Sequence, residues 1–274
     1  MLRQAQHDRL TASKAFLMSN LPAITPPEPE PDPWASLKAY TAARIALGRT
    51  GTSVPLRESL AFKLAHAHAR DAVYSTLETP RLLAELPALQ LPVCQVRSQA
   101  KTRPDYLQRP DWGRQLDEES RARLAEQAAG ACDVAIILAD GLSATAINEH
   151  ALPLLRHLLP LLQEAGFRLG PLTLAEHARV ALGDEVGHLL GARLTLLLIG
   201  ERPGLSSPHS LGAYFTYAPR PGLTDEARNC VSNIRPEGLP YPAAAAQLFR
   251  LLQESRRRQL SGVGLKDEFD QLGE

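Results

Sequence analysis

The chain has 274 residues, and its 30 lysines and arginines are balanced by 30 aspartates and glutamates. A net charge of zero argues against a nucleic-acid-binding protein that relies on bulk electrostatics, because such proteins carry a basic excess. Aromatic residues make up only 5%, which argues against the stacking surfaces of single-strand binders. A hydrophobic content of 44% with 22% charged residues is typical of a globular protein, and this length suits one large domain or two unequal ones.

The three cysteines, Cys94, Cys132 and Cys230, lie far apart. No C-x-x-C spacing occurs, which excludes a cysteine zinc cage and a thioredoxin-type motif. The odd count and wide spacing predict reduced thiols in a cytoplasmic protein. The first residues contain no apolar core of a secretory signal. The longest apolar runs, 134–139 and 194–199, have the length of strands and fall far short of the roughly 20 residues of a membrane span.

Residues 1–33 are predicted to form a flexible extension. A short amphipathic helix fits residues 1–20, and the proline-rich segment 22–33 lacks many of the backbone donors that a helix or sheet needs. A disordered tail is the favoured interpretation. A short helical docking or address peptide is the alternative.

A small helical domain is predicted over residues 34–90. Helices are expected at 34–48 and 56–78, the second with apolar residues at helical spacing. His66 and His68 lie two residues apart on it, and residues at that spacing do not share a helix face. They are therefore a poor metal-binding pair and are expected at the surface.

Residues 91–274 are predicted to form an α/β domain with a Rossmann-like, mostly parallel sheet. The expected strands are 91–96, 133–139, 167–174, 193–199 and 211–218, and the expected helices are 117–129, 144–165, 176–190 and 242–258. Strands that are apolar throughout and alternate with helices are typical of a parallel sheet covered on both faces.

Two strand ends repeat one pattern of an acid, a glycine turn and a serine. Asp140 and Ser143 follow the strand 133–139, and Glu201 and Ser206 follow the strand 193–199. Ligands of open α/β sheets bind outside the carboxyl ends of the strands, so these side chains are candidates for ligand contact. The alternative is that Asp140 and Ser143 only cap the next helix.

The common signatures of cofactor and nucleophile sites are missing. No G-x-G-x-x-G follows the first strong strand, no P-loop motif occurs, and residues 141–145 lack the second glycine of a nucleophile elbow. His150 lies two helical turns beyond Ser143, so a serine triad is not expected. His177 and His188 are expected as single helix histidines.

Cys230 falls in a polar, arginine-rich segment, 223–239. This segment is expected to be a loop folded against a ligand or another chain.

Several segments together resemble the small subunit of ethanolamine ammonia-lyase. They are DGLSATA at 140–146, RVALGDE at 179–185, GERPGLSSP at 200–208, CVSNIRP at 230–236, RRRQLSG at 256–262 and LKD at 265–267. The likeness runs in order through residues 34–268. Several long matching segments in the same order are far more specific than one short motif.

The resemblance implies a hetero-oligomeric lyase. In that family the small subunit pairs with a large barrel subunit that holds ethanolamine, and adenosylcobalamin binds at their interface and enables conversion of ethanolamine to acetaldehyde and ammonia. The cobalamin-contact positions of the family correspond to Val180, Glu201 and Cys230. In the family the N-terminal end can direct the enzyme into a bacterial microcompartment, and the linker at 22–33 fits such a tether.

No residue of this chain is expected to bind cobalt or to be catalytic. Some cobalamin enzymes use a D-x-H-x-x-G histidine, and His188 with Gly191 matches its second half, but Val186 stands where the aspartate should be. The cofactor should therefore keep its own base, while the protein holds and tunes it. Without the resemblance, the alternatives are a stand-alone nucleotide-dependent oxidoreductase of Rossmann fold and a non-catalytic scaffold.

Overall fold

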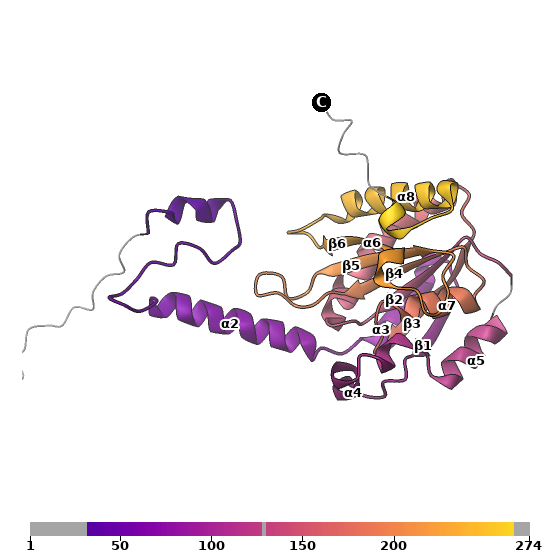
Figure 1. Cartoon of the computed structure of the whole chain (residues 1–274), viewed down its shortest axis with the longest axis horizontal. Helices are drawn as coiled ribbons and strands as arrows, with labels where there is room; N and C mark the ends of the chain where they lie inside the picture. The colour runs from indigo at the N-terminus through magenta and orange to yellow at the C-terminus, as the bar shows by residue number, and fades with distance from the viewer. Residues whose placement is uncertain (1–31, 128–129, 266–274) are drawn as a thin grey trace, which may run out of the picture. The chain divides into compact units, whose positions relative to one another are not determined.

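The computed structural model describes residues 32–127 and 130–265 (Figure 1). The chain divides into two compact units between Ala61 and Phe62. The predicted extension lies outside the described residues except for its last two positions. The helix expected at 1–20 is entirely outside them.

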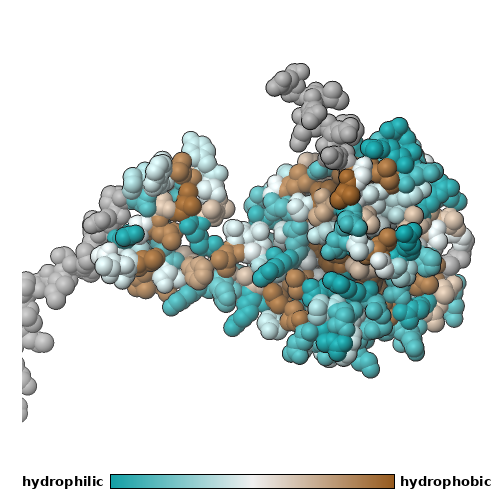
Figure 2. Space-filling view, in the orientation of Figure 1, coloured by the Kyte–Doolittle hydropathy of each residue, from teal (hydrophilic) through white to brown (hydrophobic). Residues whose placement is uncertain are grey.

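The first unit contains little regular structure. A 3-10 helix, η1 (Ala35–Ala39), is followed by an irregular segment and by the start of α2 (Leu56–Val73). The helix predicted over 34–48 is therefore wrong beyond Ala39. Pro55 is the one buried residue of 32–61, so no core stabilises a long helix there, and an unpacked helix is marginal in water. Hydrophobic side chains are instead visible on the surface of this unit (Figure 2).

The helix predicted over 56–78 is confirmed as α2 but ends five residues early, and a further helix that was not predicted follows it. Helix α2 ends at Val73, and α3 (Thr79–Glu85) begins after a short connection. The Ser75 hydroxyl donates to the Ala72 carbonyl at 2.7 Å and accepts from the Thr145 amide at 3.1 Å. Pro80 suits the first turn of a helix, where no amide donor is needed. His66 and His68 of α2 are exposed, as predicted.

A six-stranded mixed sheet forms the centre of the second unit, in the order β1-β3-β2-β4-β5-β6. Its strands are β1 (Val93–Arg97), β2 (Val134–Ala139), β3 (Leu169–Glu176), β4 (Leu194–Gly200), β5 (Leu211–Tyr217) and β6 (Arg228–Ile234). The first four are parallel, whereas β5 and β6 are antiparallel to their neighbours. All five predicted strands are confirmed, with ends that shift by up to two residues.

Helices cover both faces of the sheet, and each face has its own core. The helices are α4 (Arg103–Gln108), α5 (Glu118–Gln127), α6 (Ala144–Glu164), α7 (Leu182–Leu189) and α8 (Tyr241–Arg258), with short 3-10 helices η2 (Leu86–Leu89), η3 (Trp112–Arg114), η4 (Asp225–Ala227) and η5 (Gly262–Gly264). Alternate residues of β2 point to opposite faces, so that Ile136 packs with α6 and α8 while Ile137 packs with α7. The apolar run of β2 thus reflects burial on both sides.

Two expectations near the candidate site are wrong. The helix predicted over 176–190 begins only at Leu182, because β3 continues to Glu176 and His177 then adopts a positive φ of 54°. His177 is therefore a loop residue. The segment 223–239 contains the edge strand β6, in which only Val231 and Ile234 are buried. Such a polar strand offers no apolar run by which it could be recognised.

Three cysteines are free: Cys94 and Cys132 are buried, and Cys230 is exposed. Within the described ranges, no helix combines the length and the hydropathy needed to cross a bilayer.

Candidate functional site

A cavity of about 700 Å³ lies at the carboxyl ends of the parallel strands. Its walls come from the segments that follow β2, β3 and β4, and from β5 and β6; they include Leu142, Val180, Glu201, Tyr214 and Asn233. The chain leaves β2 for α6 on one face and leaves β3 for α7 on the other. A ligand crevice is expected where neighbouring connections diverge in this way. The cavity therefore lies where the sheet topology predicts a ligand site.

The turn that follows β2 approaches the end of β4 closely and shapes one wall of the cavity. Gly141 has a φ of +56°, and a Cβ atom there would lie 2.3 Å from the carbonyl oxygen of Gly200. The amide of Leu142 donates to that carbonyl at 3.0 Å. Only glycine satisfies both the backbone conformation and this spacing, and the turn that results brings Leu142 to the cavity.

Glu201 connects three segments at the cavity wall. Its Oε2 accepts from the Ser210 hydroxyl at 2.6 Å and from the Asn233 amide at 3.2 Å. The end of β4 is thereby tied to the start of β5 and the end of β6. Because Glu201 lines the cavity, its carboxylate can accept a hydrogen bond from a ligand.

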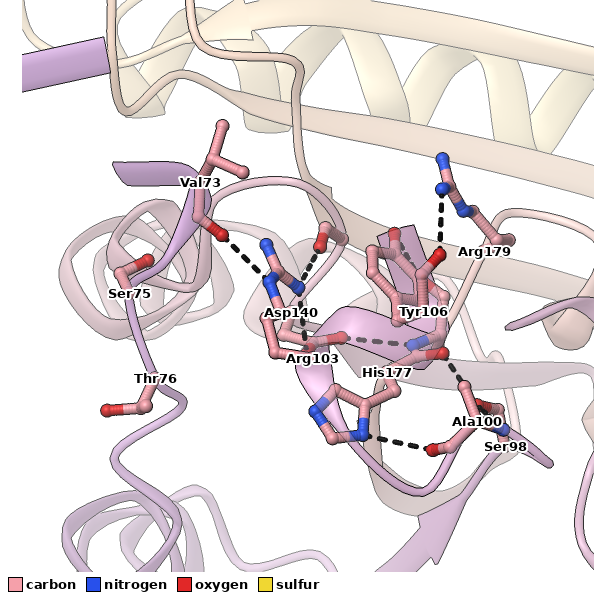
Figure 3. A network of polar contacts seen from close by, with 12 residues as sticks. Val73, Ser75, Thr76, Ser98, Ala100, Arg103, Tyr106, Asp140, His177 and Arg179 are labelled. Carbon is pink, nitrogen blue, oxygen red and sulfur yellow. Dashed lines mark hydrogen bonds and ion pairs between the residues drawn. The ribbon is translucent and has the colours of Figure 1, made fainter. Parts of the chain in front are cut away.

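Arg179 supplies a positive charge to the same cavity. Its guanidinium lies 4.3 Å from the centre of the Tyr106 ring, and Nη2 donates to the Tyr106 carbonyl at 3.2 Å (Figure 3). Its Nε is buried and has no partner among the described residues. A buried N–H without an acceptor is costly, and the residue as a whole contributes a positive charge to the cavity wall.

Asp140 does not face the cavity but holds its surroundings together. Its Oδ1 accepts from the Ala178 amide at 3.0 Å, and its Oδ2 lies 3.5 Å from Arg103 Nη1 (Figure 3). Burial raises the pKa of Asp140, against the opposing effects of the Ala178 amide and the Arg103 charge. Arg103 also donates to the carbonyls of Val73 and Gly141. The end of α2, the β2 turn and the β3–α7 loop are joined through these two residues.

Ser143 does not cap α6 with its side chain, and neither Asp140 nor Ser143 is among the residues that line the cavity. Ser143 precedes α6 but makes no capping hydrogen bond, and its hydroxyl donates to the Pro208 carbonyl at 3.2 Å. Both side chains are buried away from the cavity. In the second instance of the pattern, Glu201 and Ser206 do line it.

The three positions singled out from the sequence lie around one cavity. Val180 and Glu201 line it directly. Cys230 is exposed on β6, opposite Tyr214 of β5, which also lines it. Desolvation raises the pKa of the Cys230 thiol and the Glu201 charge raises it further, while the hydrogen bond from Tyr214 lowers it. Strand pairing therefore brings Cys230 beside the site although it does not form its wall.

A second cavity, of about 820 Å³, shares Arg179 and Val180 with the first. Arg114, Arg121 and Arg228 contribute to it as well. Glu185 and Asp225 also line it and pair with Arg121 and Arg228. The four arginines come from separate parts of the chain, so no local motif predicts this group. Tyr106 and Arg179 were missed in the same way, since the cation–π contact that unites them depends on tertiary structure alone.

Comparison with known proteins decides the family. The profile of the family described as Ethanolamine ammonia-lyase light chain (EutC) matches residues 31–266. This chain belongs to that family. The match includes all six strands and every segment that lines the cavity.

Three curated relatives are called ethanolamine ammonia-lyase small subunit. The protein from Azotobacter vinelandii is 56% identical over 240 residues, covering 86% of this chain and 89% of its own length. That from Ralstonia nicotianae is 53% identical over 246 residues, covering 89% and 91%. That from Pseudomonas putida is 53% identical over 244 residues, covering 88% and 90%. The resemblance seen in the sequence is confirmed, and family membership makes this chain a subunit of an ammonia-lyase.

Proposed function

We propose that this chain is the cobalamin-binding subunit of an ethanolamine ammonia-lyase, and that the strand-end cavity holds part of adenosylcobalamin. The observation that carries the proposal is the convergence of Val180 and Glu201, from separate loops, on one cavity that Cys230 adjoins. The family is dependent on coenzyme B12, and these are the positions that its pattern assigns to cofactor contact.

The chemistry of the cavity fits this cofactor. The periphery of a corrin carries amide groups, each of which both donates and accepts hydrogen bonds. The cavity offers the carboxylate of Glu201, the guanidinium of Arg179 and the polar side chain of Asn233. Charge-assisted hydrogen bonds of this kind are stronger than neutral ones.

The cofactor is expected to keep its own base on cobalt. No histidine lines the cavity within the described chain. His188, the near-match to a cobalt-binding motif, is exposed on α7. When bound, adenosylcobalamin supplies the radical chemistry. The residues of this chain bind and orient it and hold a polar environment around it.

We infer that a large partner subunit completes the site and carries ethanolamine. A cavity of about 700 Å³ is the size of a site for a drug-sized ligand, and adenosylcobalamin is much larger, so another surface must cover the rest. In the first unit, Trp34, Tyr40, Val54, Leu56 and Leu60 are exposed. Apolar surface of this extent marks an interaction site.

We also interpret the parallel half of the sheet as Rossmann-like, and residues 91–274 as the cobalamin-binding domain.

Localisation remains part of the proposal. The reduced thiols predicted from the sequence suit the cytoplasm. The N-terminal extension, as a tether to a bacterial microcompartment, falls on residues outside the described ranges.

The division of labour is tested by assaying ethanolamine turnover with adenosylcobalamin for this chain alone, for the large subunit alone and for their mixture. We expect acetaldehyde and ammonia only from the mixture. Turnover by this chain alone would contradict the proposal.

The cavity is tested by Glu201→Gln in the reconstituted complex. The amide keeps an acceptor for Ser210 and Asn233 but loses the charge. Loss of one charge-assisted hydrogen bond, worth roughly 1.5–3 kcal/mol, should weaken cobalamin binding about ten- to a hundredfold. Glu126→Gln, an exposed carboxylate on α5, is the matched control and should change nothing. If Glu201→Gln lowers the melting temperature while affinity is unchanged, Glu201 serves only to tie the strands together.

His188→Ala tests the assignment of the cobalt base. The electron paramagnetic resonance spectrum of the bound cofactor should not change, and nitrogen-15 labelling of the protein should leave its nitrogen hyperfine pattern unaltered. A change under protein labelling would mean that a protein nitrogen binds cobalt.

A further inference from the structure

A second group of potential ligand atoms lies outside the cavity, where α6 meets the segment between β4 and β5. It consists of Glu149 and His150 on α6 and His209 on that segment. One ligand atom from each side chain lies within 4.8 Å of the other two. Nothing in the proposed cobalamin chemistry uses these residues.

His150 is the buried member, and its ring is held in a defined orientation. The residue is 4% exposed, and Nδ1 lies 2.9 Å from the Tyr241 hydroxyl at the start of α8. Its Nε2 is buried and has no hydrogen-bond partner in the described residues. That atom points toward Glu149, at 3.8 Å from Oε2. An outer hydrogen bond that orients a ring and leaves the other nitrogen free is the usual arrangement of a metal-binding histidine.

The two remaining side chains complete a triangle around the free nitrogen. His209 Nε2 lies 3.9 Å from the same Glu149 oxygen, and the two imidazole rings are 5.7 Å apart between centres. In the tautomer in which Nδ1–H donates to the Tyr241 hydroxyl, Nε2 carries the lone pair that a metal ion requires. A metal ion between Nε2 and the Glu149 carboxylate satisfies both groups.

The spacing suits a transition metal after a small adjustment. Nitrogen and oxygen ligands of tetrahedral zinc stand about 2.0–2.1 Å from the ion, which places them about 3.3 Å from one another. The ligand atoms of the three side chains therefore need to move about 0.5–1.5 Å closer to one another. Glu149 and His209 can move, because their side chains are 50% and 37% exposed. Calcium and magnesium prefer oxygen ligands, so two imidazoles exclude them.

We propose that Glu149, His150 and His209 bind a divalent transition-metal ion of the zinc type, with Tyr241 orienting the buried ligand. The ion joins α6 to the β4–β5 segment, which also supplies Ser206, Ser207 and Ser210 to the cofactor cavity. A fourth position stays open to water, as in sites with three protein ligands.

The proposal is tested by zinc titration of the full chain without an affinity tag, in competition with a chromophoric chelator. The key variant is His209→Ala, because this residue lies partly exposed on a connecting segment and its loss should leave the fold intact. We expect one zinc-binding site to weaken about a hundredfold or more. Tyr241→Phe should weaken it by about tenfold, as outer-shell changes do. His157→Ala, an exposed histidine on the same helix, is the matched control.

Thermal melting provides an independent measurement, because an ion that binds only the folded chain raises its stability. Zinc should raise the melting temperature of the wild type and of His157→Ala but not that of His209→Ala. Equal zinc affinity in the wild type and His209→Ala would overturn the proposal, as would a wild type whose melting temperature does not respond to zinc. Neither measurement involves cobalamin or ethanolamine, so its outcome is independent of the proposed function.

Discussion

Asp184 and Arg228 form an ion pair in which each side chain is only 3% exposed, and this pair joins α7 to β6 beside the candidate cofactor site. Burial raises the pKa of Asp184 although the hydrogen bond from Arg228 lowers it. Removing one partner of a buried pair leaves an uncompensated charge, which costs about 3–5 kcal/mol. We therefore expect Asp184→Asn to lower the free energy of unfolding by about 3 kcal/mol in urea denaturation, since Asp225 still compensates part of the Arg228 charge.

The control for this variant is Glu254→Gln. Glu254 pairs with Arg257 on the surface of α8, where Arg257 is 72% exposed. Exposed pairs contribute little to stability, because water and salt screen the two charges. Equal, small losses in the two variants would show that the buried pair adds little to stability.

Gly141 and Gly166 provide a matched pair for testing the turn at the cavity wall. Both have positive φ, +56° and +71°, but a Cβ at Gly166 meets no atom within 4 Å, whereas one at Gly141 meets the Gly200 carbonyl at 2.3 Å. Gly166→Ala should cost about 1–2 kcal/mol for its backbone conformation. Gly141→Ala must also displace backbone, so we expect at least about 2 kcal/mol more. Similar unfolding free energies for the two variants would contradict the close approach of β2 and β4.

Much of the sheet could be predicted because burial on both faces leaves a direct mark on the sequence. The runs 134–139 and 194–199 became β2 and β4, and the long amphipathic segment 144–165 became α6. The crevice at the strand ends follows from the alternation of strands and helices. Val180 and Glu201 were placed through family resemblance, and the cavity now unites them.

The remaining features depend on contacts between distant residues. Helix α7 starts late because His177 adopts a positive φ, and its ring lies 3.1 Å from the Ala100 carbonyl oxygen. The edge strand β6 exists through pairing with β5 and has a polar outer face. The contact of His150 with Tyr241 joins residues that are 91 positions apart. No local sequence pattern indicates these contacts between distant residues.

Asp133 should make stability depend on pH in the acid range. Burial tends to raise its pKa, but the Arg168 amide and the charges of Arg168 and Arg193 lower it overall. A carboxyl group whose pKa is lower in the folded state stabilises the protein above its unfolded pKa of about 3.9, and this contribution is lost as the pH falls through the folded value. Asp133→Asn should therefore cost about 1 kcal/mol at pH 7 and progressively less below about pH 4.

The comparison for Asp133 is Glu164→Gln, an exposed carboxylate at the end of α6. Urea unfolding of wild type and both variants across the acid range gives the pH dependence directly. A constant difference between wild type and Asp133→Asn at all pH values would show that its ionisation does not matter.

Cys230 should be the one thiol of the folded chain that alkylating reagents reach quickly. Cys94 and Cys132 are 3% and 7% exposed, whereas Cys230 is exposed on β6. Because thiolate is the reactive form and the pKa of Cys230 is raised, its labelling rate should keep increasing above the usual thiol pKa of about 8.5. Mass spectrometry after iodoacetamide treatment should find one fast adduct per chain, absent in Cys230→Ser. Adenosylcobalamin bound to the complex should slow this reaction if Cys230 adjoins the cofactor.

Two neighbours of Cys230 should change its reactivity in opposite directions. The Glu201 charge raises the thiol pKa and the hydrogen bond from Tyr214 lowers it. At a fixed pH near 8, Glu201→Gln should therefore label faster than the wild type, because more thiolate is present. Tyr214→Phe should label more slowly, because the thiolate loses a donor. A shift in the same direction in both variants would mean that altered access, and not the charge and hydrogen bond at the cavity, controls the thiol.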